Sequence, residues 1–141
     1  MTRPLRILMV EDNAGDAEFA REALEGAVPT VAIDAVTDGA QAIAYLKRLP
    51  PFENADLPDV VLLDLNLPKV DGREVLAEVK RDERLRRIPI VVLTSSDSEQ
   101  DVRKSYELGA NCYVTKPVGL AESVEALTTI ARFWLSMVKL P

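Results

Sequence analysis

The chain has no histidine and a single cysteine, Cys112, among its 141 residues. Without histidine it cannot form a Ser–His or Cys–His nucleophile pair or a zinc site with histidine ligands, and it cannot carry a phosphoryl group on a histidine of its own. A single cysteine cannot pair within the chain, and its apolar surroundings, GANCYV, favour a buried, reduced thiol in a cytoplasmic protein. These absences exclude several classes of enzyme and metal site.

Long apolar runs and excess positive charge are also missing. No stretch approaches the roughly 20 apolar residues of a membrane span, and the N-terminus, MTRPLRILMVED, does not resemble a signal peptide. The net charge of −6 argues against nucleic acid as a direct partner, because phosphate-backbone binding needs a basic patch, and it gives no support to binding an anionic membrane. Hydrophobic residues make up 48% of the chain, which is enough for the core of one domain spanning residues 1–141.

Short apolar runs alternate with longer segments of helical periodicity. The runs are continuous, as is typical of strands buried on both faces, and their alternation with helices predicts a parallel sheet with right-handed crossovers. We therefore expect an α/β fold, a flavodoxin-like (βα)5 three-layer sandwich with a parallel five-stranded sheet in the order 2-1-3-4-5. The expected strands are 5–10, 30–36, 60–63, 90–93 and 112–114, and the expected helices are 16–24, 39–49, 72–85, 98–108 and 120–138.

Polar side chains follow four of these strands at their carboxyl ends, where ligands bind in open parallel sheets. Taken singly, each has an ordinary explanation: a helix cap, a solvated acid or a surface cation. Together they fall at one edge of the sheet, which predicts a site. They are Glu11 and Asp12 after the first strand, Asp64 and Asn66 after the third, Thr94 after the fourth and Lys116 after the fifth.

The chemistry of these groups indicates why they belong together. Carboxylates crowd in this way only when a positive charge joins them, and Mg²⁺ favours oxygen ligands with few protein carboxylates and a phosphate oxygen. A carboxylate can also attack phosphorus and form an aspartyl phosphate, whose charge a metal, a lysine and a hydroxyl donor would neutralise. Asp64 is the best candidate nucleophile, because it follows the central strand of the expected sheet.

The motifs VEDN, LLDLNLPKVDG, VLTSS and GANCYVTKP, in this order, resemble the receiver domain of bacterial response regulators. The resemblance runs from about Leu5 to the end of the chain, and it implies a role for each matching position. Asp64 would be the phosphoacceptor, and Thr94 and Lys116 would contact the phosphoryl oxygens. Mg²⁺ would be held by Asp12, Asp64, the backbone carbonyl of Asn66 and, through water, Glu11. Thr94 and Tyr113 would form the conformational switch, and the Lys116–Pro117 peptide bond would be cis.

The leading functional hypothesis is a stand-alone response regulator with no effector domain. It would accept a phosphoryl group from a partner histidine kinase onto Asp64, change its protein–protein interactions, and catalyse only its own phosphorylation and dephosphorylation. One alternative is a phosphatase or phosphotransferase of the haloacid-dehalogenase type, but such enzymes need a second Asp where this chain has Asn66. A flavin or nucleotide module is another, but VEDNAGDAE offers no glycine-rich phosphate cradle.

The last expected helix carries two apolar stripes at about 100° per residue. A helix that covers a sheet needs one stripe, so we expect the second to form a protein interface, most simply a two-fold homodimer, although it could instead pack against a neighbouring helix. The ending ARFWLSMVKLP and the loop PPFENADLPD resemble single-domain regulators of phytochrome-type histidine kinases. The stripe expected to face the sheet is Leu120, Val124, Leu127, Ala131, Trp134 and Val138; the second is Ala126, Ile130, Phe133, Met137 and Leu140. The predicted interface residues are Ile130, Phe133, Trp134 and Met137.

Overall fold

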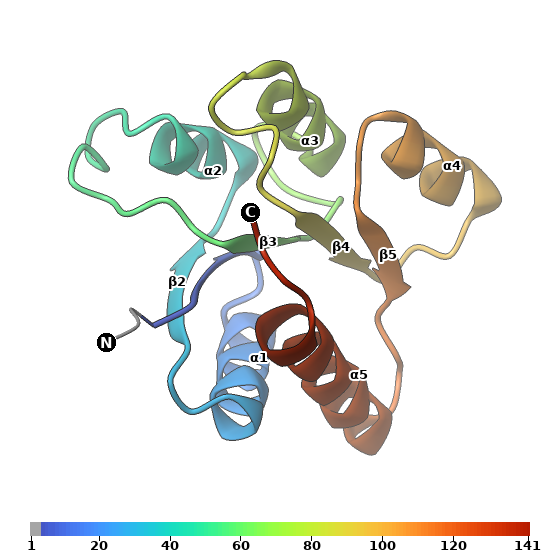
Figure 1. Cartoon of the computed structure of the whole chain (residues 1–141). Helices are drawn as coiled ribbons and strands as arrows, with labels where there is room; N and C mark the ends of the chain where they lie inside the picture. Colours follow the sequence, from blue (N-terminus) through green and yellow to red (C-terminus); the bar gives the residue numbers. More distant parts are fainter. Residues whose placement is uncertain (1–3) are drawn as a thin grey trace.

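A computed structural model describes residues 4–141 and contains a parallel five-stranded sheet in the order β2-β1-β3-β4-β5. The strands alternate with helices along the chain (Figure 1), which confirms the expected flavodoxin-like fold and strand order. The strands are β1 Arg6–Val10, β2 Ala32–Val36, β3 Val60–Leu63, β4 Ile90–Thr94 and β5 Cys112–Thr115. The helices are α1 Ala14–Ala27, α2 Gly39–Leu46, α3 Gly72–Arg81, α4 Glu99–Glu107 and α5 Leu120–Arg132, followed by a π-helical turn at Phe133–Met137.

Helices cover both faces of the sheet, with α2, α3 and α4 on one side and α1 and α5 on the other (Figure 1). Successive residues of a strand point to opposite faces, so the continuous apolar run of β3 feeds two cores. Val61 and Leu63 pack beneath α2 and α3, and Val60 and Leu62 pack against α1 and α5. All four are at most 3% exposed, so β3 is the buried centre of the molecule.

The first four helices begin with a polar side chain that accepts a hydrogen bond from a backbone N–H of the first turn. The free N–H groups of a helix start need such partners, and each cap contributes about 1 kcal/mol to stability. Because every crossover begins at the carboxyl end of a strand, these caps lie at the edge where the predicted site residues also lie. The capping residues are Asn13, Asp38, Asp71 and Ser98.

The last helix differs from the expected continuous α-helix over 120–138. The α-helical pattern of α5 ends at Arg132, and the chain continues as a π-helical turn in which the Val138 N–H donates to the Phe133 carbonyl at 2.8 Å. A π-helix has more residues per turn than an α-helix, so side chains beyond Arg132 leave the 100° spacing on which the two stripes were drawn. Leu135, assigned to neither stripe, is consequently buried, at 7% exposed.

The two stripes are therefore only partly as predicted. Leu127 and Ala131 face the core, but Leu120 and Val124, expected to face the sheet, are 72% and 41% exposed. The first turn of α5 borders a cavity beside α1, so the sheet does not cover Leu120. Ile130, predicted to lie in an interface, is 7% exposed and belongs to the chain's own core, which removes it from any partner surface. Within residues 4–141, no helix has both the length and the apolar character needed to cross a bilayer.

Candidate functional site

Three carboxylates from two strand ends converge at the carboxyl edge of the sheet. Glu11 and Asp12 follow β1 and Asp64 follows β3, and one oxygen of each lies within 4.8 Å of the others. The parallel register that pairs Val10 with Leu63 brings these strand ends level. Glu11 and Asp64 are buried, at 7% and 8% exposed, while Asp12 is exposed and faces the solvent side. The predicted acidic cluster is therefore present, and its donor set is one that a divalent cation prefers.

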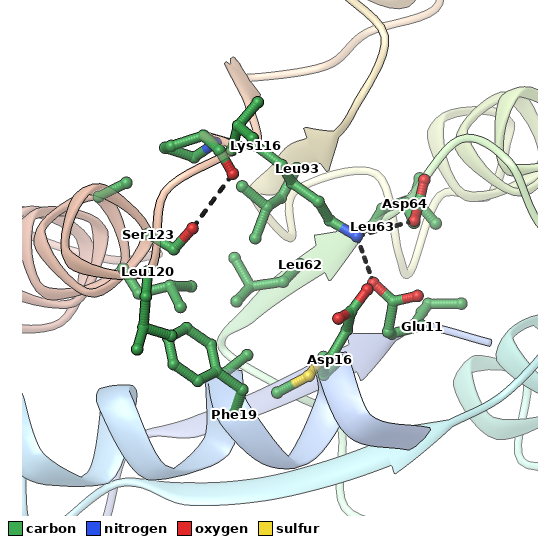
Figure 2. A pocket seen from close by; sticks show the side chains of 17 residues that line it. Glu11, Asp16, Phe19, Leu62, Leu63, Asp64, Leu93, Lys116, Leu120 and Ser123 are labelled. Carbon is green, nitrogen blue, oxygen red and sulfur yellow. Dashed lines mark hydrogen bonds and ion pairs between the residues drawn. The ribbon is translucent and has the colours of Figure 1, made fainter. Parts of the chain in front are cut away.

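Lys116 follows β5 by one residue, and β5 lies on the opposite side of the central strand β3 from β1, which carries Glu11 and Asp12 at its end. The Lys116 side chain reaches into the acidic cluster. Its ammonium nitrogen lies 2.5 Å from Oε1 of Glu11 and 3.0 Å from Oδ2 of Asp64 (Figure 2). Burial lowers the pKa of Lys116, but the hydrogen bond to Glu11 and the charge of Asp64 outweigh burial, so its net pKa lies above the ordinary value. Burial also raises the pKa of Glu11, and the hydrogen bond from Lys116 offsets only part of that rise. Lys116 is thus the counter-ion of two buried acids.

We expect the Lys116→Met variant to lose about 2 kcal/mol of unfolding free energy when no divalent cation is present. Removing one partner of a buried ion pair leaves uncompensated charge, which costs about 3–5 kcal/mol in fully buried pairs and less here, where the lysine is partly solvated. Urea denaturation with a chelator, and again with Mg²⁺, measures the effect. Mg²⁺ should restore most of the loss, whereas an equal loss in both buffers would contradict the charge argument.

Two further donors converge on Asp64 from neighbouring segments. The Thr94 hydroxyl at the end of β4 donates to Oδ1 at 3.1 Å, and the backbone N–H of Asn66 donates to the same oxygen at 3.1 Å. Thr94 is completely buried, so its hydroxyl is held in the site by packing as well as by this bond. Tyr113, on β5, has its hydroxyl turned to another partner: it donates to the backbone carbonyl of Ser96 at 2.8 Å.

The Lys116–Pro117 peptide bond is not cis, contrary to the prediction from the family resemblance. Within residues 4–141 the cis bond lies instead between Pro50 and Pro51. The trans form is favoured by about 0.5–1 kcal/mol even before proline. With a trans bond, Lys116 still reaches both acids, and its backbone N–H still donates to the Thr94 carbonyl at 2.7 Å, so nothing in the local contacts requires the cis form.

A cavity of about 410 Å³ opens beside the acidic cluster, between α1 and α5. Figure 2 shows Glu11, Asp64 and Lys116 at one wall and Phe19 and Leu120 at another, with Leu62 and Leu93 at its base. Sequence reasoning did not predict this space, since it depends on how far the first turn of α5 stands from α1. No periodicity in the chain reports that distance.

A polar network beside the site was also missed. The guanidinium of Arg73 lies 2.6 Å from Oδ1 of Asp101, and the Ser96 hydroxyl donates to Oδ2 of the same carboxylate at 2.5 Å. The Ser96 hydrogen bond and then the Arg73 contact lower the pKa of Asp101. Ser96 and Asp101 lie close together in the chain, but Arg73 lies 28 residues before Asp101, so only the tertiary structure completes the network.

Comparison with known proteins identifies the same family as the motifs. The sequence-family model named response regulator receiver domain matches residues 7–128 of the chain. Response regulator Rcp1 from Synechocystis is 46% identical over 138 residues, covering 98% of this chain and 94% of Rcp1. The crystal structure of the phosphorylated cyanobacterial phytochrome response regulator RcpA is 46% identical, with a TM-score of 0.95 and coverage of 98% of this chain and 99% of that one.

The Mn²⁺-bound form of Rcp1 is equally similar, at 46% identity and a TM-score of 0.94, and covers 98% of this chain and 99% of its own. These matches extend over the strand ends that carry Glu11, Asp12, Asp64, Thr94 and Lys116. They decide against the haloacid-dehalogenase alternative, which no finding supports. The chain belongs to the response regulator receiver domain family.

Proposed function

We propose that this protein is a stand-alone response regulator whose Asp64 accepts a phosphoryl group from a partner histidine kinase in the cytoplasm. The observation that carries the proposal is the convergence on Asp64 of Thr94 at 3.1 Å and Lys116 at 3.0 Å, beside Glu11 and Asp12. This set provides a nucleophile, two phosphoryl-oxygen donors and a cation site in one place. The protein would catalyse only its own phosphorylation and dephosphorylation. Phosphorylation would change its surface and thereby its interactions with other proteins.

In the proposed reaction a carboxylate oxygen of Asp64 attacks the phosphorus of the donor. A P–O bond to Asp64 forms while the bond to the donor's histidine nitrogen breaks, and the electron pair leaves with that nitrogen. Lys116 would exchange part of its contact with Glu11 and Asp64 for a phosphoryl oxygen, and the Thr94 hydroxyl would donate to another. Both groups already point at Asp64, so little reorganisation is needed at the moment of transfer.

The acidic cluster fits a divalent cation, and we propose Mg²⁺. Carboxylate oxygens of Asp12 and Asp64 and the backbone carbonyl of Asn66 would hold it, with Glu11 acting through water. Glu11 suits the indirect role, because its Oε1 is taken by Lys116 and its Oε2 accepts the Asn13 N–H at 3.1 Å. The bound cation would neutralise charge on the transferring phosphoryl group.

The direct test is incubation of the purified protein with Mg²⁺ and a small phosphodonor such as acetyl phosphate. We expect each chain to gain one phosphate by intact mass, which hydroxylamine removes as it does any acyl phosphate, and peptide mapping should locate it in the segment that contains Asp64. A chelator should abolish labelling, because the crowded carboxylates repel the donor when no cation is bound. Labelling that survives chelation, or that maps to a hydroxyl side chain, would contradict the proposal.

We propose a phytochrome-type histidine kinase as the partner, because the chain is similar along nearly its whole length to RcpA, which is called a cyanobacterial phytochrome response regulator. The proposal rests on that similarity and not on a contact in the chain. Phosphotransfer profiling against the histidine kinases of the host tests it. Transfer to this protein from a phytochrome kinase should be faster than from kinases with other sensor domains, and equal rates would contradict the pairing.

We also propose a homodimer through the end of the chain. Phe133 and Met137 in the π-helical turn are 48% and 76% exposed, and Trp134, half-buried beside them, packs edge-on against the Phe133 ring at 5.5 Å. A second copy would cover this apolar face by two-fold symmetry.

The Met137→Lys variant should weaken dimerisation about tenfold or more, measured by sedimentation, because it places a charge in the contact. Leu49→Lys, on an exposed apolar residue that follows α2 and lies outside the proposed interface, should leave dimerisation unchanged. Equal dimer affinity in the two variants would contradict this interface.

A further inference from the structure

Arg73, Asp101 and Ser96 form a continuous bridge between α3, α4 and the loop 95–98 that joins β4 to α4; we call it the α3–α4 bridge. The Arg73 guanidinium holds Oδ1 of Asp101 at 2.6 Å, and the Ser96 hydroxyl holds Oδ2 at 2.5 Å. On its other side, Arg73 donates to both carboxylate oxygens of Asp71, the capping residue of α3, at 3.1 Å each. Both oxygens of Asp101 are therefore occupied, and Arg73 is anchored on its own helix.

The two ends of the bridge differ in how firmly they are packed. α3 buries Val75, Leu76 and Val79 against the core, so it is a firm support. Among the nine residues of α4 only Ser105 is buried, and its hydroxyl has no hydrogen-bond partner. An element with so little buried apolar surface is readily displaced, so polar contacts at its first turn carry more weight in placing it. The side chains of Arg73 and Asp101 are 29% and 24% exposed, which limits the screening of their contact by water.

The loop that the bridge holds touches the two residues of the proposed switch. It begins directly after Thr94, which donates to Asp64, and the carbonyl of Ser96 accepts the Tyr113 hydroxyl at 2.8 Å. Ser96 thus has its side chain on Asp101 and its backbone on Tyr113. Displacement of Ser96 would take the acceptor away from Tyr113 and loosen the segment that carries Thr94.

We propose that Arg73 is a positioning residue for the switch: through Asp101 and Ser96 it keeps the loop 95–98 in place and the Tyr113 hydroxyl on the Ser96 carbonyl in the unphosphorylated protein. The bridge pre-organises Thr94 for the phosphoryl group, and its loss lets Tyr113 leave the Ser96 carbonyl and slows phosphorylation. The slower phosphorylation rests on the proposed phosphoacceptor role of Asp64, whereas the release of Tyr113 from the Ser96 carbonyl does not.

The first test follows Tyr113 directly and needs no phosphorylation. The chain has three tyrosines, so labelling with 3-fluorotyrosine gives three fluorine resonances, which Tyr→Phe variants assign. Tyr45, at 6% exposed, and Tyr106, at 50%, serve as internal references for a buried and a solvated ring. The difference in fluorine chemical shift between H₂O and D₂O reports how far each ring is exposed to solvent. For Tyr113 in the Arg73→Met variant, this difference should move toward the value for Tyr106, and the Asp101→Asn variant should show the same effect. An unchanged Tyr113 resonance in both variants overturns the proposal.

Two variants separate positioning from a general loss of structure. Arg73→Lys keeps the charge and one donor, and it should restore the Tyr113 resonance at least in part. Arg81→Met removes a second arginine from α3, one that pairs with Glu78 at 2.6 Å near the other end of the helix, and it should leave Tyr113 unchanged. A shift in Arg81→Met as large as in Arg73→Met would attribute the effect to α3 as a whole and overturn the proposal.

The second test measures the rate of labelling by acetyl phosphate with Mg²⁺. Arg73→Met should be labelled about fivefold more slowly than the unmodified protein, a typical size for coupling between sites, while Arg81→Met should keep the full rate. If the unmodified protein is labelled and Arg73→Met is labelled at the same rate, the positioning role fails and the proposed function stands. If the unmodified protein takes no phosphate, the proposed function fails, and the fluorine measurement still decides the position of Tyr113.

Discussion

The Asp64→Asn variant is expected to take up no phosphate from acetyl phosphate and Mg²⁺ under conditions that label the unmodified protein completely. An amide has no anionic oxygen with which to attack phosphorus, and the substitution removes the negative charge that the Lys116 ammonium contacts at 3.0 Å. We expect the labelling rate to fall about 100-fold or more, because the carboxylate is the bond-forming group and not an auxiliary one. Intact mass spectrometry over a time course measures it.

Asp16→Asn is the matched control for this experiment. Asp16 lies in the first turn of α1 and lines the same cavity as Asp64, but it is exposed and not part of the acidic cluster. The Asp16→Asn substitution changes the charge of the protein by the same amount as Asp64→Asn. The variant should nevertheless be labelled at nearly the rate of the unmodified protein. Circular dichroism should show both variants folded. Equal labelling of Asp64→Asn and Asp16→Asn would assign the phosphoacceptor to another residue.

The Gly72→Ala variant is expected to lose about 3 kcal/mol of unfolding free energy, at the upper end of ordinary overpacking costs. A Cβ at this position would lie 2.4 Å from the Asp64 carbonyl oxygen and 2.6 Å from the Leu65 Cα. Both contacts are with backbone, so no side chain can turn away to relieve them. The Gly72 N–H also donates to the Leu65 carbonyl at 3.0 Å, which fixes the start of α3 against the strand end.

The same clash should disturb the site, because the segment that must move carries Asp64. We expect slower labelling of Gly72→Ala even at temperatures where the variant is fully folded. Gly26→Ala is the control: it lies near the end of α1, a Cβ there meets nothing within 4 Å, and alanine favours a helix by about 0.5–1 kcal/mol over glycine. Urea denaturation compares the two. A Gly72→Ala variant as stable as Gly26→Ala would show that the backbone can move apart at little cost.

Much of the fold followed from local chemistry. The run 60–63 coincides with β3, and its four consecutive apolar residues are all buried because helices cover both faces of that strand. The starts of α2 and α3 at Gly39 and Gly72 also agree with the expectation, since Asp38 and Asp71 cap them. Helix ends agree less well: α3 ends at Arg81 and not at 85, because apolar Leu85 continues the periodicity but packs from a turn.

Three expectations about the end of the chain and the site were wrong, each for its own reason. The apolar stripes of the last helix were assigned on the assumption of one continuous α-helical period, but the π-helical turn at Phe133–Met137 changes the angle between successive residues. Ile130 was placed at an interface because it is apolar and off the main stripe, but it is 7% exposed because the core reaches it. The cis bond expected at Lys116–Pro117 was implied by a family pattern and not by a local contact, and the structure does not contain it.

The sequence by itself determined which groups stand at the carboxyl edge of the sheet, because the order of apolar runs and the polar residues that follow them are properties of the chain. Only the tertiary structure decided how those groups meet: Lys116 bridges Glu11 and Asp64, and Thr94 bonds Asp64. It also added a contact that the sequence did not predict, between Arg73 and Asp101. The physical reason is range. Capping, turns and periodicity act within a few residues, whereas ion pairs and cavities depend on the positions of elements far apart in the chain, such as the 30 residues between Asp64 and Thr94 and the 105 between Glu11 and Lys116.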